Sequence, residues 1–125
     1  MTTPFRRAAA LLAFVASSLA APAFAAFPEK PVRIVIGFPA GGPLDQHARL
    51  LADRLGTVLG QPVLIDYKAG AGGTVGAQEV MRAPADGYTL MLANTGVMVI
   101  NPALNARLPY QTLRDFTPIA RTAMQ

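Results

Sequence analysis

Hydrophobic and polar positions along the chain alternate between two kinds of segment. Val32–Ile36 is mostly apolar and β-branched, which is typical of a buried strand. A glycine-rich loop follows, and beyond it apolar residues recur at helical spacing. Pro43 suits the first position of a helix and Gly60 suits its end. The pattern therefore predicts a helix over Pro43–Leu59, whose apolar face consists of Leu44, Ala48, Leu51, Ala52, Leu55 and Leu59.

The same strand, loop and helix order follows a second time. Val63–Tyr67 predicts a strand that is again rich in β-branched and apolar residues. Residues 68–73 form a second glycine-rich loop. Thr74–Arg82 predicts a helix, and Thr74 is expected to be its N-cap because a threonine hydroxyl can accept a backbone N–H there.

The pattern weakens towards the end of the chain. Residues 89–93 predict a third strand, and residues 97–100 predict a helical turn. Residues 116–120 predict a fourth strand at an edge, because Pro118 has no N–H to donate to a neighbour. The order βαβαβ predicts an α/β fold with an open sheet of parallel strands.

Three loops are expected to gather at the carboxyl ends of these strands, where ligands bind in open α/β sheets. They are residues 38–42, 70–73 and 94–96. Backbone N–H groups in glycine-rich loops that lead into helices can hold an anion, such as the two oxygens of a carboxylate. Glycines that only permit tight turns fit the same pattern equally well.

Nucleotide binding is the main alternative for the second loop. The stretch that starts at Gly70 has the first two glycines of a dinucleotide fingerprint, but Val75 occupies the third position. The next strand ends at Asn94, where an acidic residue is expected to bind a ribose. The chain also lacks a Gly-Lys-Thr or Gly-Lys-Ser sequence, which excludes a P-loop. A nucleotide-using enzyme is therefore disfavoured.

Residue content excludes several kinds of catalytic site. The chain has no cysteine, its serines are Ser17 and Ser18, and its one histidine is His47. Serine or cysteine nucleophiles and Cys/His zinc sites are thereby excluded from residues 26–125. Asp45 and Arg49 are expected to pair on the outer face of the first helix, near a solvated His47. The remaining isolated acids, expected on the surface or in turns, are Asp53, Glu79, Asp86 and Asp115.

The N-terminal residues are typical of a secretory signal peptide. Arg6 and Arg7 precede an apolar run over residues 8–20, and an Ala-x-Ala triplet ends at Ala25. The run is shorter than the roughly 20 residues that cross a membrane. We expect residues 1–25 to be cleaved and residues 26–125 to be periplasmic and not membrane-embedded. Removal of both arginines lowers the formal net charge from +4 to +2, so nucleic acid is not an expected partner.

An ordered series of motifs resembles the receptors of tripartite tricarboxylate transporters, also called Bug receptors. Each motif is short, but together they cover most of residues 26–125 in order. The motifs are residues 27–42, Asp45, Ala48-Arg49, Leu59-Gly60-Gln61-Pro62-Val63, Gly70-Ala71-Gly72-Gly73, residues 84–90, Ile100-Asn101-Pro102, Leu108-Pro109-Tyr110 and residues 115–120.

The resemblance implies a Venus-flytrap protein of the periplasmic-binding-protein type, with two α/β domains that close on a small carboxylated solute. It implies a receptor and not an enzyme, without a cofactor, that delivers its solute to membrane transporter subunits. Asp45 is assigned a role in ordering the first loop. The positions that the resemblance places at the ligand are Phe38, Pro39, Ala40, Gly41, Gly42, Ala71, Gly72, Gly73, Asn94 and Thr95.

Two departures from the family pattern affect these expectations. Pro43-Leu44 replaces the small or hydroxylated residues that are usual after the glycine pair, which removes one N–H donor. Residues 26–125 are also expected to be only part of the first domain, without the second domain or the late segment that completes the first sheet. The chain is thus interpreted as a receptor fragment, and the alternative is a truncated relic that does not bind.

Export gives the first testable prediction. Mass spectrometry of the periplasmic protein should find a mature N-terminus at Ala26 or Phe27, because cleavage is expected after Ala25 or Ala26. An uncleaved cytoplasmic chain that retains Met1 would contradict the predicted signal peptide.

Overall fold

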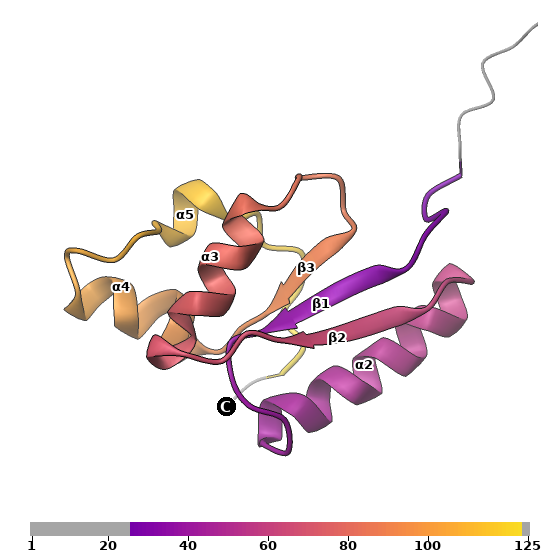
Figure 1. The fold of residues 1–125 in the computed structure, drawn as a ribbon, viewed down its shortest axis with the longest axis horizontal. Helices are drawn as coiled ribbons and strands as arrows, with labels where there is room; N and C mark the ends of the chain where they lie inside the picture. The colour runs from indigo at the N-terminus through magenta and orange to yellow at the C-terminus, as the bar shows by residue number, and fades with distance from the viewer. Residues whose placement is uncertain (1–25, 124–125) are drawn as a thin grey trace, which may run out of the picture.

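A computed structural model describes residues 26–123, so the predicted signal peptide over residues 1–25 lies outside the described part. Most of the predicted elements are confirmed within one or two residues. Figure 1 shows their arrangement. The elements are β1 (Val32–Ile36), α2 (Pro43–Leu59), β2 (Val63–Tyr67), η1 (Ala71–Gly73), α3 (Thr74–Arg82), β3 (Thr89–Leu92), η2 (Gly96–Ile100), α4 (Asn101–Leu104) and α5 (Thr112–Asp115).

The three strands form one parallel sheet in the order β2-β1-β3, which confirms the predicted open α/β sheet. Ile34 of the central strand is in register with Ile65 on one side and with Leu90 on the other. β1 is central and nearly all of it is buried, as its β-branched sequence predicts. All three strands point the same way, so their following loops lie at one end of the sheet (Figure 1).

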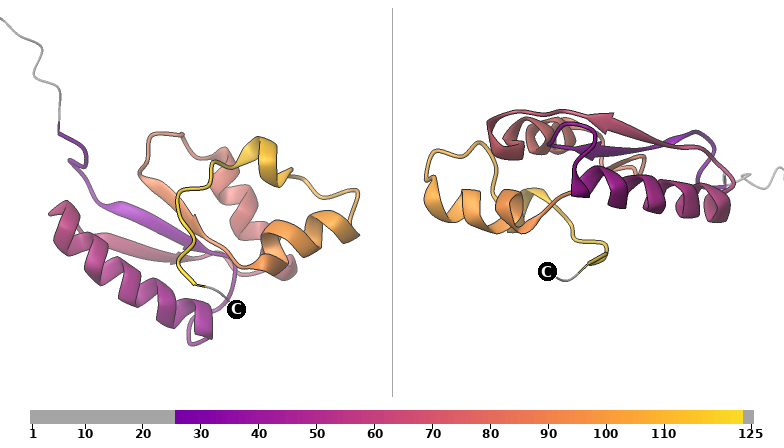
Figure 2. Two further views of the ribbon diagram at one scale, coloured as in Figure 1. Left: turned by 180° about the vertical axis from the view of Figure 1, so that it is seen from behind. Right: turned by 90° about the horizontal axis from the view of Figure 1, so that it is seen from below.

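Helices pack on both faces of the sheet (Figure 2). On one face Ile34, Ile36 and Leu92 pack with Ala48 of α2 and with its partly buried leucines. On the other face Ala77 of α3 forms a second cluster with residues from η2 and the following segment. Alternate residues of β3 thus face opposite layers, since Leu90 and Leu92 pack in the first cluster and Met91 in the second, as the pleat of a strand requires.

Two details of the predicted elements are wrong. The N-cap of α3 is Gly73 and not Thr74, because Gly73 has a left-handed φ of 91° and Thr74 is already helical. Residues 116–120 do not form a strand. The ring of Phe116 instead packs edge-on against Tyr110 at a centroid distance of 5.7 Å, and Pro118 gives this segment no N–H for a sheet.

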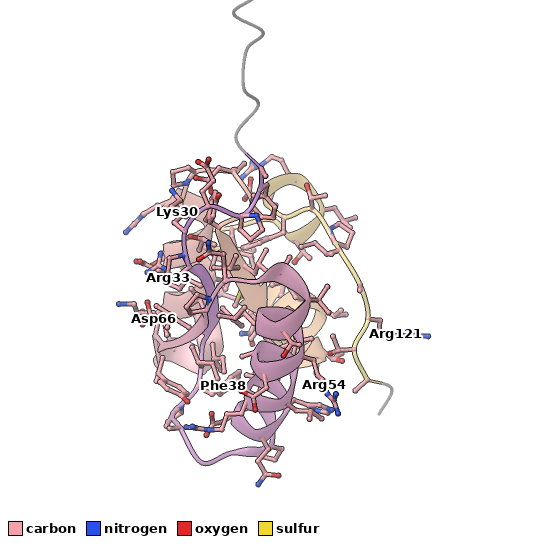
Figure 3. The ribbon with its side chains drawn as sticks, turned by 90° about the vertical axis from the view of Figure 1, so that its right-hand side faces the viewer. Lys30, Arg33, Phe38, Arg54, Asp66 and Arg121 are labelled. Atoms are coloured by element: carbon pink, nitrogen blue, oxygen red, sulfur yellow. The ribbon has the colours of Figure 1, made fainter. Side chains whose placement is uncertain are left out.

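An ion-pair network ties α3 to the sheet. Arg33 of β1 donates from Nη1 to Asp66 of β2 at 2.8 Å and to Glu79 of α3 at 3.3 Å. Figure 3 shows Arg33 and Asp66 side by side. Glu79 therefore connects α3 to the sheet. The sequence predicted a surface position for Glu79 but not this contact.

The packing of α3 on β1 is a contact between backbones. A Cβ atom added to Gly76 would lie 2.8 Å from the Cα of Gly37, and one added to Gly37 would lie 2.6 Å from the Cα of Gly73. Any side chain at these positions would push the helix away from the strand. This contact places η1 directly beside the carboxyl end of β1. None of the helices in residues 26–123 is both long and apolar enough to span a membrane.

A comparison of two helical glycines tests this contact. Gly76→Ala should lower the free energy of unfolding by about 1–3 kcal/mol, because the new methyl meets the backbone of Gly37. Gly56→Ala in α2 is the matched control, since its Cβ would meet no atom closer than 3.4 Å, and it should raise stability by about 0.5–1 kcal/mol. Denaturant unfolding of residues 26–125 measures both. Equal effects of the two substitutions would contradict the close contact.

Candidate functional site

The three loops predicted at the ligand lie together beyond the strand ends (Figure 1). The first and second loops approach through Gly37 and Gly73. The second loop also contacts η2, which follows the third loop, because the side chain of Val97 occupies the space that a Cβ at Gly73 would need. The backbone contacts in the core of the fold thus bring the predicted positions to one place.

Asp45 organises the first loop. Its Oδ2 accepts the backbone N–H of Gly41 at 2.7 Å, and its Oδ1 accepts the Tyr67 hydroxyl at 2.6 Å. Arg49 approaches Oδ1 through Nε at 3.0 Å and donates from Nη2 to the Tyr67 oxygen at 2.8 Å. The expected Asp45–Arg49 pair is confirmed, but its expected place on the outer face of the helix is wrong for Asp45. That side chain is only 5% exposed, and three donors offset the cost of burying its charge.

These contacts decide the charge of Asp45. The hydrogen bonds from Tyr67 and then from Gly41 hold the pKa of Asp45 below its ordinary value of 3.8. The same contact with Asp45, together with burial, raises the pKa of the Tyr67 hydroxyl. At neutral pH the carboxylate is therefore ionised and the phenol remains a donor. The negative charge beside the loop is balanced by Arg49.

The second loop has an unusual backbone. Residues 70–73 have φ values of 147°, 46°, 63° and 91° in succession. Ala71 is the only non-glycine with a positive φ among residues 26–123, and a left-handed conformation costs about 1–2 kcal/mol for such a residue. The Gly73 N–H donates to the Gly70 carbonyl at 2.9 Å and closes the turn. Such strain persists where the surrounding structure enforces it, often at functional sites.

Several backbone N–H groups in the first two loops have no hydrogen-bond partner among the described residues. They include those of Ala40 and Gly42 in the first loop and those of Ala71 and Gly72 in the second. Those of Gly42 and Ala71 lie at or near the starts of α2 and η1–α3. Unpaired N–H groups at helix starts are suited to an anion.

Other positions that were predicted to contact the ligand make contacts within the protein. The N–H of Gly41 binds Asp45, and Pro39 has no N–H to offer. The side chain of Phe38 packs against both core clusters. The Oδ1 of Asn94 accepts the Val97 N–H at 3.1 Å, and Thr95 is the exposed N-cap of η2. Ligand contacts at all of these positions remain predictions.

Sequence reasoning missed two residues that order the loops. Tyr67 ends β2 and reaches Asp45, and Asn101 donates from Nδ2 to the Gly72 carbonyl at 2.9 Å. The available indications were a hydroxyl at the end of a strand and an Asn-Pro motif near the third loop. Within residues 26–123, no group of three or more His, Cys, Asp or Glu residues is placed to hold a metal ion.

The charge of Asp45 gives a pH-dependent prediction. Because its pKa is lowered in the folded state, its contribution to stability is present above its ordinary pKa of 3.8 and is lost as the pH falls through the folded-state value. Asp45→Asn should therefore be less stable at pH 7 and should lose less stability in acid. The stability of the variant should still depend partly on pH in acid, because Asp115, whose pKa is lowered to about 2, is unchanged in it.

The measurement is urea unfolding at pH 7, 4 and 3, values chosen to span the ordinary pKa of 3.8. Asp53→Asn is the control, because Asp53 lies on the same helix with an exposed side chain. A parallel loss of stability with pH in Asp45→Asn and in the unsubstituted chain would show that Asp45 is not the titrating group.

Comparisons with known proteins place the chain in a family. The family model described as "Tripartite tricarboxylate transporter family receptor" matches residues 47–125. BugT of Bordetella pertussis is 38% identical over 110 residues, which are 86% of this chain and 34% of BugT. A UPF0065 protein from the tcbD-tcbE intergenic region of Pseudomonas sp. strain P51 is 39% identical over 112 residues, 90% of this chain and 33% of that protein. The chain thus spans about a third of the length of these relatives.

Solved structures agree with this placement. MatC from Rhodopseudomonas palustris with bound malate superimposes with a TM-score of 0.71 at 41% identity, over 74% of this chain and 31% of MatC. An R. palustris protein with adipate gives a TM-score of 0.70 at 37% identity, over 74% of this chain and 31% of its own. The periplasmic binding protein BugD gives 0.65 at 42% identity, over 69% and 28%. The fold is part of a periplasmic-binding-protein α/β domain, and the chain belongs to the tripartite tricarboxylate transporter receptor family.

Proposed function

We propose that this chain forms one wall of a periplasmic receptor that binds a small carboxylate and delivers it to membrane subunits of a tripartite tricarboxylate-type transporter. The observation that carries the proposal is the pair of adjacent loops with unpaired N–H groups at Ala40, Gly42, Ala71 and Gly72. Support comes from the family and from two structural relatives, one with bound malate and one with adipate.

The chemistry of a carboxylate fits this arrangement. Its two oxygens offer about four acceptor sites, and the N–H groups of Ala40, Gly42, Ala71 and Gly72 offer one donor each. A hydrogen bond to a charged group contributes about 1.5–3 kcal/mol. A few such bonds approach the roughly −8 kcal/mol of micromolar binding, before the costs of association.

Asp45 acts on the loop and not on the ligand in this proposal. Its carboxylate would repel an anion in direct contact, but its oxygens are occupied by Gly41, Tyr67 and Arg49. By holding the Gly41 N–H, it fixes the turn that leaves the neighbouring N–H of Gly42 unpaired. The loop is thus ordered before a ligand arrives, which lowers the entropic cost of binding.

The alternative to this proposal is that the chain is a relic of such a receptor and binds no carboxylate. Large apolar side chains are exposed on the described surface, including Leu104, Leu113 and Ile119 at 82%, 96% and 78%. The described residues supply one wall of the proposed site. One wall leaves an anion largely in water, where each hydrogen bond exchanges with solvent for little net gain.

Gly42 offers a test that deletes a single donor. Its φ of −84° is close to that of proline, and a Cβ there would meet no atom within 4 Å. Gly42→Pro removes the N–H and should weaken carboxylate binding about tenfold or more. Gly42→Ala, which keeps the N–H, is the matched control and should bind like the unsubstituted protein.

Calorimetry with a panel of mono- and dicarboxylates makes the measurement on a completed receptor. This is residues 26–125 joined to the part of MatC that lies beyond its match with this chain. Equal affinity of the Pro and Ala variants would remove Gly42 from the site. A folded completed receptor that binds no carboxylate in any form would favour the non-binding alternative.

A further inference from the structure

Two motifs of the family resemblance lie outside the three loops, and the structure connects them to the second loop. Asn101, from the Ile100-Asn101-Pro102 motif, begins α4 and donates from Nδ2 to the Gly72 carbonyl at 2.9 Å. The N–H of the same peptide belongs to Gly73 and donates to the Gly70 carbonyl at 2.9 Å. Both polar groups of the Gly72–Gly73 peptide are therefore held, one within the loop and one by Asn101.

A steric contact reinforces this hydrogen bond. Val97 of η2 is fully buried, and its side chain occupies the position that a Cβ at Gly73 would take. The second loop is thus pressed against η2 at Gly73 and bonded to the start of α4 at Gly72. Any shift of η2 along its axis would disturb both contacts at once.

Tyr110, from the Leu108-Pro109-Tyr110 motif, fixes η2 in its place. η2 is a π-helix, in which the Asn101 N–H reaches back five residues to the Gly96 carbonyl. The next carbonyl in this register, that of Val97, would need the N–H of residue 102, which is Pro102 and has none. The Tyr110 hydroxyl, on a side chain that is 2% exposed, donates to the Val97 carbonyl in its place.

Two further observations support this role for the segment after α4. Thr112 donates from Oγ1 to the Met98 carbonyl at 2.7 Å, so two successive η2 carbonyls are bound by side chains from residues 110–112. Burial raises the pKa of Tyr110, so its hydroxyl remains protonated and can donate at neutral pH.

We propose that Asn101 is a positioning residue for the carboxylate site, and that Tyr110 holds Asn101 in place through η2. The inference rests on the proposed function. Asn101 fixes the Gly72–Gly73 peptide and thereby the strained turn in which the Ala71 and Gly72 N–H groups remain unpaired. It contacts the loop that binds the ligand and not the ligand itself.

The test compares two asparagines in the completed receptor. Asn101→Ala removes the donor to Gly72 and should weaken malate binding about five- to tenfold, the equivalent of one hydrogen bond. Asn105→Ala is the matched control, because Asn105 follows the same short helix and its side chain accepts the nearby Arg107 N–H, with no bond to the second loop among residues 26–123. Binding is measured by calorimetry and stability by thermal unfolding.

Amide NMR spectra of the ligand-free protein supply a readout that general destabilisation would not produce. Asn101→Ala should move the resonances of Gly72 and Gly73, and Tyr110→Phe should move the same resonances because it loosens η2 and Asn101. Asn105→Ala should leave them in place. Unchanged malate affinity in Asn101→Ala, or unchanged Gly72 and Gly73 resonances, would overturn the inference and leave the proposed function standing. Absence of binding to every carboxylate of the panel by the unsubstituted completed receptor would overturn both.

Discussion

The close backbone contact between β1 and the η1–α3 unit is the constraint on which the rest of the structure depends. Gly37, Gly73 and Gly76 meet without side chains between them, so the second loop lies directly against the end of the central strand. A parallel sheet places the ends of its strands at one edge, and a side chain at any of these glycines would push the helix and its loop away from that edge. The glycines thus let the first two loops approach each other at the backbone, and in the proposed function donors from both loops bind one small anion.

The two loops are ordered by different physical means. The first is held by charge, because the ionised Asp45 accepts the Gly41 N–H while Tyr67 and Arg49 satisfy its other oxygen. The second is held by shape and by neutral hydrogen bonds, through Val97 and Asn101. Protonation of Asp45 in acid is therefore expected to weaken the order of the first loop. In both loops the side chains that do the ordering come from outside the glycine motif.

Features that depend on residues close together in the sequence could be predicted from the sequence, whereas features that depend on distant residues could not. The strands and the long helix have clear hydrophobic periods, and Gly60 ends α2 in a left-handed conformation, as its position predicts. The cap of α3 was misplaced because nothing local shows that Gly73 takes a left-handed φ in place of a Thr74 cap. The inward turn of Asp45 depends on Tyr67, 22 residues away, and helical spacing alone gives only its pairing with Arg49. Contacts between residues so far apart in the sequence leave no periodic pattern of hydrophobic and polar positions from which they could be predicted.

The central claim is that backbone donors of the first two loops hold a carboxylate. The most direct measurement is an NMR titration of the completed receptor, labelled with ¹⁵N, with malate. The account predicts saturable shifts of the Ala40, Gly42, Ala71 and Gly72 amides, while exposed positions on α2 such as His47 stay unmoved. Saturable malate binding that leaves these four amide resonances in place would contradict it.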